Sequence, residues 1–193
     1  AMLHISADKT EQRFSFRDMS RLSNRCANYF RTLGIGKGDR VMLVLKRHYQ
    51  FWIAMLALNK IGAIAIPAVN QLQEHDFSYR FRAAGVRMIL CTADGDTAHQ
   101  AEKAIEECDD TVEFKLIVGG KRDGWRDFDE EYPRFSAHYD RPDDAPGGDD
   151  LMLMFFTSGT SGYPKLAAHN YKYALGHFHT AKYWHNVDPD GLH

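Results

Sequence analysis

A run of six apolar residues, from Leu151 to Phe156, passes directly into a segment of hydroxyl residues and glycines that ends at Lys165. A short, continuous apolar run is typical of a strand that is covered on both faces of its sheet. Glycine lets the backbone approach an anion closely, and successive N–H groups in such a turn can form an anion-binding nest. The two features together predict a buried strand that leads into a phosphate-binding loop.

Hydroxyl donors and one mobile cation give this loop the chemistry that a phosphate group requires. Pro164 disfavours a helical conformation for the residue before it, so we expect the chain to leave the loop as a strand. A flexible linker is the alternative interpretation, but linkers rarely follow directly on a buried strand. The candidate phosphate-binding residues are Thr157, Ser158, Gly159, Thr160, Ser161, Gly162 and Lys165.

Two common nucleotide-binding motifs do not fit the loop. A Walker A motif needs G-x-x-x-x-G-K-[ST] at the start of a helix, whereas here Gly159 and Gly162 are three positions apart and Lys165 follows a Tyr-Pro pair. The G-x-G-x-x-G fingerprint of dinucleotide-binding folds is absent from the segment. A P-loop kinase or NTPase is therefore disfavoured.

Upstream of the loop, patterns of helical and strand period alternate along the chain. This alternation predicts an α/β fold, with a mostly parallel layered sheet and helices on both faces. Residues 119–148 are polar and lack a clear period, and we expect their aromatic residues to be packing anchors. The acidic, Pro/Gly-rich stretch over residues 141–150 is predicted to be a loop. The predicted helices cover residues 15–33, 48–61, 74–84, 96–108 and 170–185, and the predicted strands cover residues 40–45, 62–69, 86–91, 114–118 and 151–156.

The charge balance and the cysteines exclude several classes of function. A net charge of −2 gives no general attraction to nucleic acid or to an anionic membrane. No apolar run approaches the ~20 residues of a membrane span, and the N-terminus lacks a signal-peptide pattern. Cys26, Cys91 and Cys108 are widely spaced, which favours reduced thiols over disulfides or a zinc site. We expect a cytoplasmic protein, and the scattered histidines predict no metal site.

From Phe156 to Lys165 the sequence resembles the phosphate-loop signature of the adenylate-forming, or AMP-binding, superfamily, aromatic-T-S-G-[TS]-[TSA]-G-x-P-K-G. This superfamily includes acyl-CoA synthetases, luciferases and peptide-synthetase adenylation domains. Leu166 replaces the last glycine, which is similar to the acetyl- and medium-chain acyl-CoA synthetase branches. Weaker packing patterns of the same family precede the loop in the expected order, around Leu22-Ser23, Gly38–Val41 and Lys60–Pro67.

The resemblance implies that the intact protein uses ATP, Mg²⁺ and CoA to convert a carboxylic acid first to an acyl-adenylate and then to a thioester. It implies that the 157–162 segment holds the β- and γ-phosphates and that Lys165 stabilises the departing pyrophosphate. Residues 1–193 are then expected to be an incomplete N-terminal domain, with an α/β region over 1–150 and the loop strand and next helix over 151–193. The family's remaining catalytic parts would lie beyond the chain end, so the chain alone is expected to be inactive.

Three alternatives remain open from the sequence. The chain could be a non-catalytic ATP- or anion-binding module, or a scaffold, of the same fold. The intact protein could also be an aryl-CoA ligase or an adenylation domain, because the residues that select the acid are absent. Residues 175–187 resemble the acetyl- and medium-chain branch and favour a short- or medium-chain acid. The sequence does not indicate which oligomeric state the protein adopts.

Overall fold

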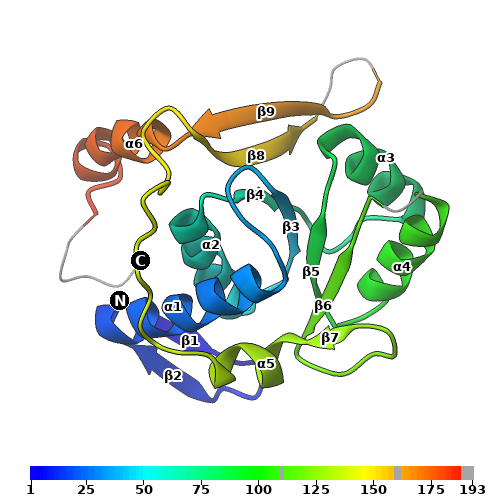
Figure 1. The fold of residues 1–193 in the computed structure, drawn as a ribbon, viewed down its shortest axis with the longest axis horizontal. Coiled ribbons are helices and arrows are strands. Elements are labelled where there is room, and N and C mark those ends of the chain that lie inside the picture. Colours follow the sequence, from blue (N-terminus) through cyan, green and yellow to red (C-terminus); the bar gives the residue numbers. More distant parts are fainter. Residues whose placement is uncertain (109–110, 159–161, 188–193) are drawn as a thin grey trace.

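The computed structural model describes residues 1–108, 111–158 and 162–187 of the 193-residue chain (Figure 1). Within these residues a seven-stranded sheet runs through the molecule in the order β7-β6-β5-β3-β4-β8-β9, and a two-stranded sheet, β1-β2, lies beside it. The strands are β1 (Met2–Ile5), β2 (Glu11–Phe14), β3 (Arg40–Val44), β4 (Ile64–Pro67), β5 (Met88–Thr92), β6 (Phe114–Val118), β7 (Arg126–Asp127), β8 (Leu151–Thr157) and β9 (Lys165–Asn170).

Neighbouring strands of the large sheet are parallel from β7 to β8, and only the β8–β9 pair is antiparallel. The helices that connect them are α1 (Phe16–Thr32), α2 (Gln50–Ile61), α3 (Glu74–Ala84), α4 (Thr97–Glu107), α5 (Phe128–Glu131) and α6 (Lys172–Tyr183). This confirms the predicted α/β fold with a mostly parallel sheet.

Alternate side chains of the central strands point into two separate cores. In β3, Val41 and Leu43 pack with residues of α1 and α2, while Met42 and Val44 pack with residues of α3 and α4. Figure 1 shows these two helix pairs on opposite sides of the sheet. Both faces of the central strands are therefore buried, which explains why their sequences are apolar without alternation.

The first long helix, α1, begins at a capping box within its predicted range, residues 15–33. Ser15 caps α1 by accepting a hydrogen bond from the Asp18 N–H, and the Asp18 carboxylate accepts from the Ser15 N–H in return, which forms a capping box. The chain then leaves the helix at Gly34, whose φ of +80° is easily adopted only by glycine. The Gly34–Gly38 segment connects α1 to β3.

The predicted loop over 141–150 is confirmed, because no helix or strand occurs there. The sequence analysis missed β7, α5 and a short 3₁₀ turn at Tyr132–Arg134, which lie in the stretch without a clear period. Elements this short carry too few residues to show a period. The packing-anchor interpretation is confirmed, since Phe128 and Tyr132 are buried in the core beneath α1. The side chains of Arg25, Asn24 and Asn28 on α1 donate hydrogen bonds to backbone carbonyls of residues 133–138 and hold this segment in place.

The prediction that β8 is buried on both faces is wrong in part, because its side chains pack against both cores but the strand is only partly buried. Only Met152 and Leu153 of this strand are buried, and Leu151 is 40% exposed. β8 lies next to the edge strand β9, and α6, which follows β9, has no buried residue. Of the helices that cover the central strands, α3 reaches β8, where the Arg80 guanidinium lies over the Phe156 ring, but this cover leaves the strand only partly buried. The β1–β2 hairpin was not predicted either.

Candidate functional site

The β8–β9 hairpin forms the candidate site. Its strands pair antiparallel up to the partners Thr157 and Lys165, and the Thr157 hydroxyl donates a hydrogen bond of 3.2 Å to the Lys165 carbonyl. The chain therefore leaves the β8–β9 loop (residues 158–164) as a strand, which confirms the expectation drawn from Pro164. Because β8 is parallel to β4, this loop opens at the carboxyl edge of the sheet, where ligands of open α/β sheets bind.

The hairpin brings the two ends of the predicted phosphate-binding segment together. Four residues are exposed at the loop end of the hairpin, namely Thr157, Ser158, Gly162 and Lys165. Among the described residues, no carboxylate lies within ion-pair distance of the Lys165 ammonium. This leaves its charge available to an anion. The other predicted binding residues, Gly159, Thr160 and Ser161, lie outside the described residues.

Gly162 occupies a backbone conformation that other residues rarely adopt, with a φ of +110°. A Cβ atom added at this position would have no heavy atom within 4 Å. Glycine is therefore required here by the backbone dihedral angle and not by lack of space. This fits a turn whose N–H groups face an anion.

Helix α3 supports the C-terminal end of the loop through Tyr79. The Tyr79 hydroxyl donates a hydrogen bond of 2.8 Å to the Pro164 carbonyl. The Tyr79 ring stacks on the ring of Tyr163, with centroids 4.7 Å apart and an angle of 20° between the planes. The sequence analysis missed this residue. Its only signal in the sequence is an aromatic residue within a predicted amphipathic helix.

Arg80, the next residue of α3, contacts the strand residue that precedes the loop. The Arg80 guanidinium lies 5.2 Å from the centre of the Phe156 ring, and it donates a hydrogen bond of 3.1 Å to Asp76. Partial burial opposes ionisation of Asp76, but hydrogen bonds from the Gln73 N–H and from Arg80 lower the pKa of its carboxyl group. The ionised carboxylate holds Arg80 over Phe156.

A second polar cluster lies along the same carboxyl edge, where the chain leaves β3 and β5. His48 Nε2 lies 2.7 Å from the Thr92 hydroxyl and 3.8 Å from an Asp94 carboxylate oxygen. Burial lowers the pKa of His48, although the Asp94 charge opposes this shift. The cluster therefore presents a neutral imidazole near neutral pH. It was not predicted from the sequence.

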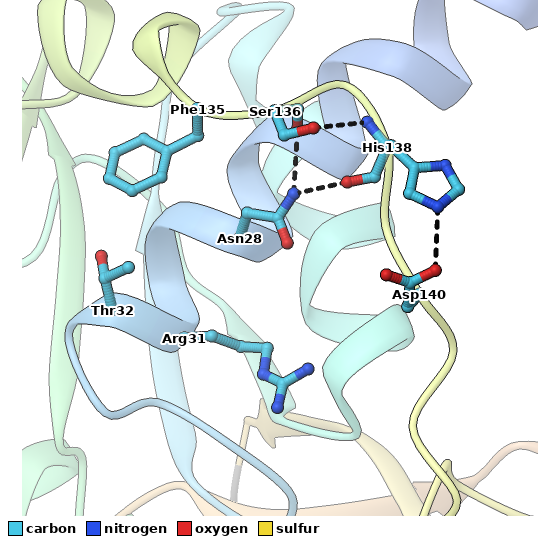
Figure 2. A pocket seen from close by; sticks show the side chains of 7 residues that line it. All are labelled: Asn28, Arg31, Thr32, Phe135, Ser136, His138 and Asp140. Atoms are coloured by element: carbon cyan, nitrogen blue, oxygen red, sulfur yellow. Dashed lines mark hydrogen bonds and ion pairs between the residues drawn. The ribbon is translucent and has the colours of Figure 1, made fainter.

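A cavity of about 510 Å³ lies elsewhere, between the C-terminal half of α1 and residues 135–140 (Figure 2). Figure 2 shows the Asn28 amide directed at the backbone carbonyls of Ser136 and His138, and the His138 ring paired with Asp140 at 2.8 Å. None of its lining residues belongs to β8, β9 or the loop between them. The cavity is separate from the candidate site.

The described parts of the chain contain neither a metal-binding cluster nor a membrane-spanning helix. No group of three or more His, Cys, Asp or Glu side chains is placed to hold a metal ion there. No helix in residues 1–108, 111–158 and 162–187 is both long and apolar enough to cross a membrane.

Comparison with known proteins gave a family match and curated relatives. The family model described as AMP-binding enzyme matches residues 2–191. The chain is 31% identical over 191 residues to the Homo sapiens acyl-coenzyme A synthetase ACSM3, mitochondrial, an alignment that covers 97% of this chain and 32% of that protein. It is 32% identical over 174 residues to the Rattus norvegicus acyl-coenzyme A synthetase ACSM5, mitochondrial, covering 89% and 29%. The chain thus spans about a third of the length of the curated relatives it matches.

Solved structures show the same fold. An acyl-CoA synthetase from Brucella canis matches with a TM-score of 0.83 and 22% identity, over 98% of this chain and 34% of that one. The anthranilate CoA ligase AuaEII, solved in complex with anthranoyl-AMP, matches with a TM-score of 0.81 and 22% identity, over 95% and 34%.

Proposed function

The chain belongs to the AMP-binding enzyme family, and from this premise we propose that the complete protein is an AMP-forming acid–thiol ligase. In the first step a carboxylate oxygen attacks the α-phosphate of ATP, which gives an acyl-adenylate and releases pyrophosphate. In the second step the CoA thiol attacks the acyl carbonyl carbon, which gives the thioester and releases AMP. Names of the relatives, each an acyl-coenzyme A synthetase, support this reaction class.

The observation that carries the proposal is that Thr157, Gly162 and Lys165 lie together at the loop end of the β8–β9 hairpin. We propose that the 157–162 segment donates backbone and hydroxyl hydrogen bonds to the β- and γ-phosphates of ATP. Gly159, Thr160 and Ser161 are included in this role on their sequence alone. The Lys165 ammonium is unpaired among the described residues, so it can approach the phosphates without first breaking an ion pair.

Lys165 then acts on the leaving group. Negative charge accumulates on pyrophosphate as its bond to the α-phosphorus breaks, and a cation already in place stabilises that charge without reorganisation. Mg²⁺ would share this charge neutralisation when it arrives with the nucleotide. The described residues hold no cluster of three or more metal-binding side chains.

We further propose that the acid is a short- or medium-chain carboxylate. Residues 175–187 support this substrate class through their sequence pattern. Residues 1–150 and 151–193 are proposed to form parts of one N-terminal domain, because β8 joins the same sheet as β4. The 193-residue chain alone is proposed to be inactive, since it spans about a third of its relatives.

The test is acid-dependent exchange of radiolabelled pyrophosphate into ATP. The complete reading frame and the 193-residue chain are assayed side by side with short, medium and aromatic acids. We expect exchange by the complete protein, greatest with short- or medium-chain acids, and none by the 193-residue chain. Preference for aromatic acids would instead support an aryl-CoA ligase.

A complete protein that exchanges with no acid would contradict the ligase proposal. ATP or pyrophosphate binding without exchange would then favour a non-catalytic anion-binding module, which is the main alternative. Turnover by the 193-residue chain would contradict the proposed inactivity of that chain without affecting the ligase assignment.

A further inference from the structure

We propose that Tyr79 on α3 is a positioning residue that holds the two flanks of the β8–β9 loop, Phe156 on one side and Tyr163–Pro164 on the other, in place for nucleotide binding. This inference rests on the proposed function, because it assigns Tyr79 a role in ATP binding at the same site. Tyr79 is not proposed to touch the nucleotide or the reacting atoms.

The contacts of Tyr79 fall on both sides of the loop. Beyond the loop, its hydroxyl bonds to the Pro164 carbonyl and its ring stacks on Tyr163. Before the loop, its ring meets the edge of Phe156, with centroids 6.1 Å apart. One side chain therefore links the residue before Thr157 to the residue before Lys165, and these two are the ends of the proposed phosphate site.

Helix α3 provides a rigid base for this side chain. Its first turn is closed by a capping box between Gln73 and Asp76. Phe77 and Phe81 on the same helix are fully buried in the core that packs against β3 and β5. A side chain carried on an anchored helix holds its partners more closely than one carried on a loop.

The Pro164 carbonyl is a well-placed point at which to hold the loop. Pro164 directly precedes Lys165, the first residue of β9. A hydrogen bond to its carbonyl fixes the peptide plane that leads into Lys165 and therefore the starting direction of that side chain. Tyr163 is 72% exposed, and the stack on Tyr79 is the one aromatic contact of its ring within the described residues.

The proposal predicts a specific kinetic signature. If Tyr79 only keeps the loop in its binding-competent conformation, its loss lowers the populated fraction of that conformation, and the apparent affinity for ATP falls by the same factor. Once ATP is bound the loop is in place, and the chemical step proceeds at its normal rate. The KM for ATP should therefore rise while kcat stays constant. Mere loss of folded protein would lower kcat and leave KM unchanged.

The experiment compares Tyr79→Phe, Tyr79→Leu and Tyr171→Phe in the complete protein. Tyr79→Phe removes the hydrogen bond and keeps the stack, whereas Tyr79→Leu removes both. Tyr171→Phe is the matched control, because its hydroxyl makes a similar bond of 2.9 Å to the Asn59 carbonyl beyond the opposite end of β9. The readouts are KM for ATP and kcat in pyrophosphate exchange, together with hydrogen–deuterium exchange at the amides of Gly162, Tyr163 and Lys165.

We expect Tyr79→Phe to raise the KM for ATP by about 2–10-fold, the usual range for one net hydrogen bond, and Tyr79→Leu to raise it further. Both should keep the kcat of the wild type and speed amide exchange in the loop, and Tyr171→Phe should do neither. An unchanged KM for ATP in Tyr79→Leu, or a fall in kcat alone, would overturn the proposal.

Failure of the proposed function can be distinguished from failure of this inference. If the wild-type protein exchanges pyrophosphate with no acid, the ligase proposal fails, and the amide measurement decides the role of Tyr79. Faster exchange at the three amides in Tyr79→Phe than in wild type and Tyr171→Phe then supports the positioning role. Equal exchange in all three proteins overturns it.

Discussion

The Lys60 ammonium donates a hydrogen bond of 2.7 Å to the Ser23 hydroxyl and so joins α2 to α1. It also donates to the Asn24 side-chain oxygen at 2.6 Å and to the Ser20 carbonyl at 3.2 Å. Ser23 is fully buried, and its own hydroxyl donates to the Met19 carbonyl. Two short patterns that are individually weak in the sequence, one around Ser23 and one around Lys60, are therefore the two halves of one contact.

Lys60→Met should destabilise the packing of α1 against α2. Hydrogen bonds from a charged donor contribute about 1.5–3 kcal/mol each, but Lys60 is partly solvated, so we expect a loss of about 1–3 kcal/mol in total. Guanidinium unfolding followed by circular dichroism measures this change in the free energy of unfolding. Lys103→Met on α4 is the control, since its one ion pair within the described residues, to Glu74, has a length of 4.0 Å and is partly exposed. Equal losses in the two variants would contradict the structural role of Lys60.

Gly162→Ala should weaken ATP binding although there is room for the added methyl group. The φ of +110° is unfavourable for alanine, and such a conformation costs on the order of 1–3 kcal/mol. We expect the loop to shift and the Kd for ATP to rise by about tenfold, measured by isothermal titration calorimetry on the complete protein. Gly36→Ala is the control, because a Cβ there also meets open space and its φ lies outside the positive range. Wild-type affinity in Gly162→Ala would show that the loop does not need this conformation to bind ATP.

Lys165→Ala in the complete protein should slow acyl-adenylate formation and spare the second step. Loss of one preorganised charge-stabilising donor costs on the order of 10²–10³ in rate. We expect this loss in pyrophosphate exchange, and near-normal thioester formation when acyl-AMP is supplied directly. Lys103→Ala should retain both activities. Equal loss in the two steps would mean that Lys165 does not act specifically on pyrophosphate.

The stability of the protein should fall as the pH drops below the usual pKa of His48, 6.5. Burial is the main cause that lowers the pKa of His48 in the folded protein; His4 and Lys46 reinforce the shift, and Asp94 and Asp129 oppose it. The unfolded chain therefore binds the proton first as the pH falls, and proton binding then favours unfolding. The stabilisation is complete above pH 6.5 and is lost as the pH falls through the folded pKa.

The measurement for this prediction is the free energy of unfolding of wild type and His48→Gln at pH 7.5 and pH 5.5. Other groups titrate over the same range, so the difference between the two proteins isolates His48. We expect a larger loss between the two pH values in the wild type. A parallel pH dependence would show that burial of His48 does not favour its neutral form.

Much of the fold could be predicted because its information is local. The apolar runs of β3, β5 and β6 and the helical periods of α1 and α3 repeat within short windows of sequence, and each predicted range contains or closely overlaps the observed element. The same holds for the strand that follows the loop, since Pro164 acts on its own neighbour. The features that the sequence analysis missed or predicted wrongly do not show such local patterns. β7 has two residues and cannot show a period, and the burial of β8 depends on which strand lies beside it.

The sequence by itself determined the α/β class, the position of the β8–β9 loop and the chemical groups that the loop carries, because each depends on residues that are neighbours along the chain. Only the tertiary structure decided what supports that loop. Tyr79 and Pro164 are 85 positions apart, and they meet because the chain crosses from β4 through α3 back to β5 on the far side of β3. This reversal of strand order leaves α3 beside the end of β8. Strand order depends on the packing of the whole sheet, which no short window of sequence contains.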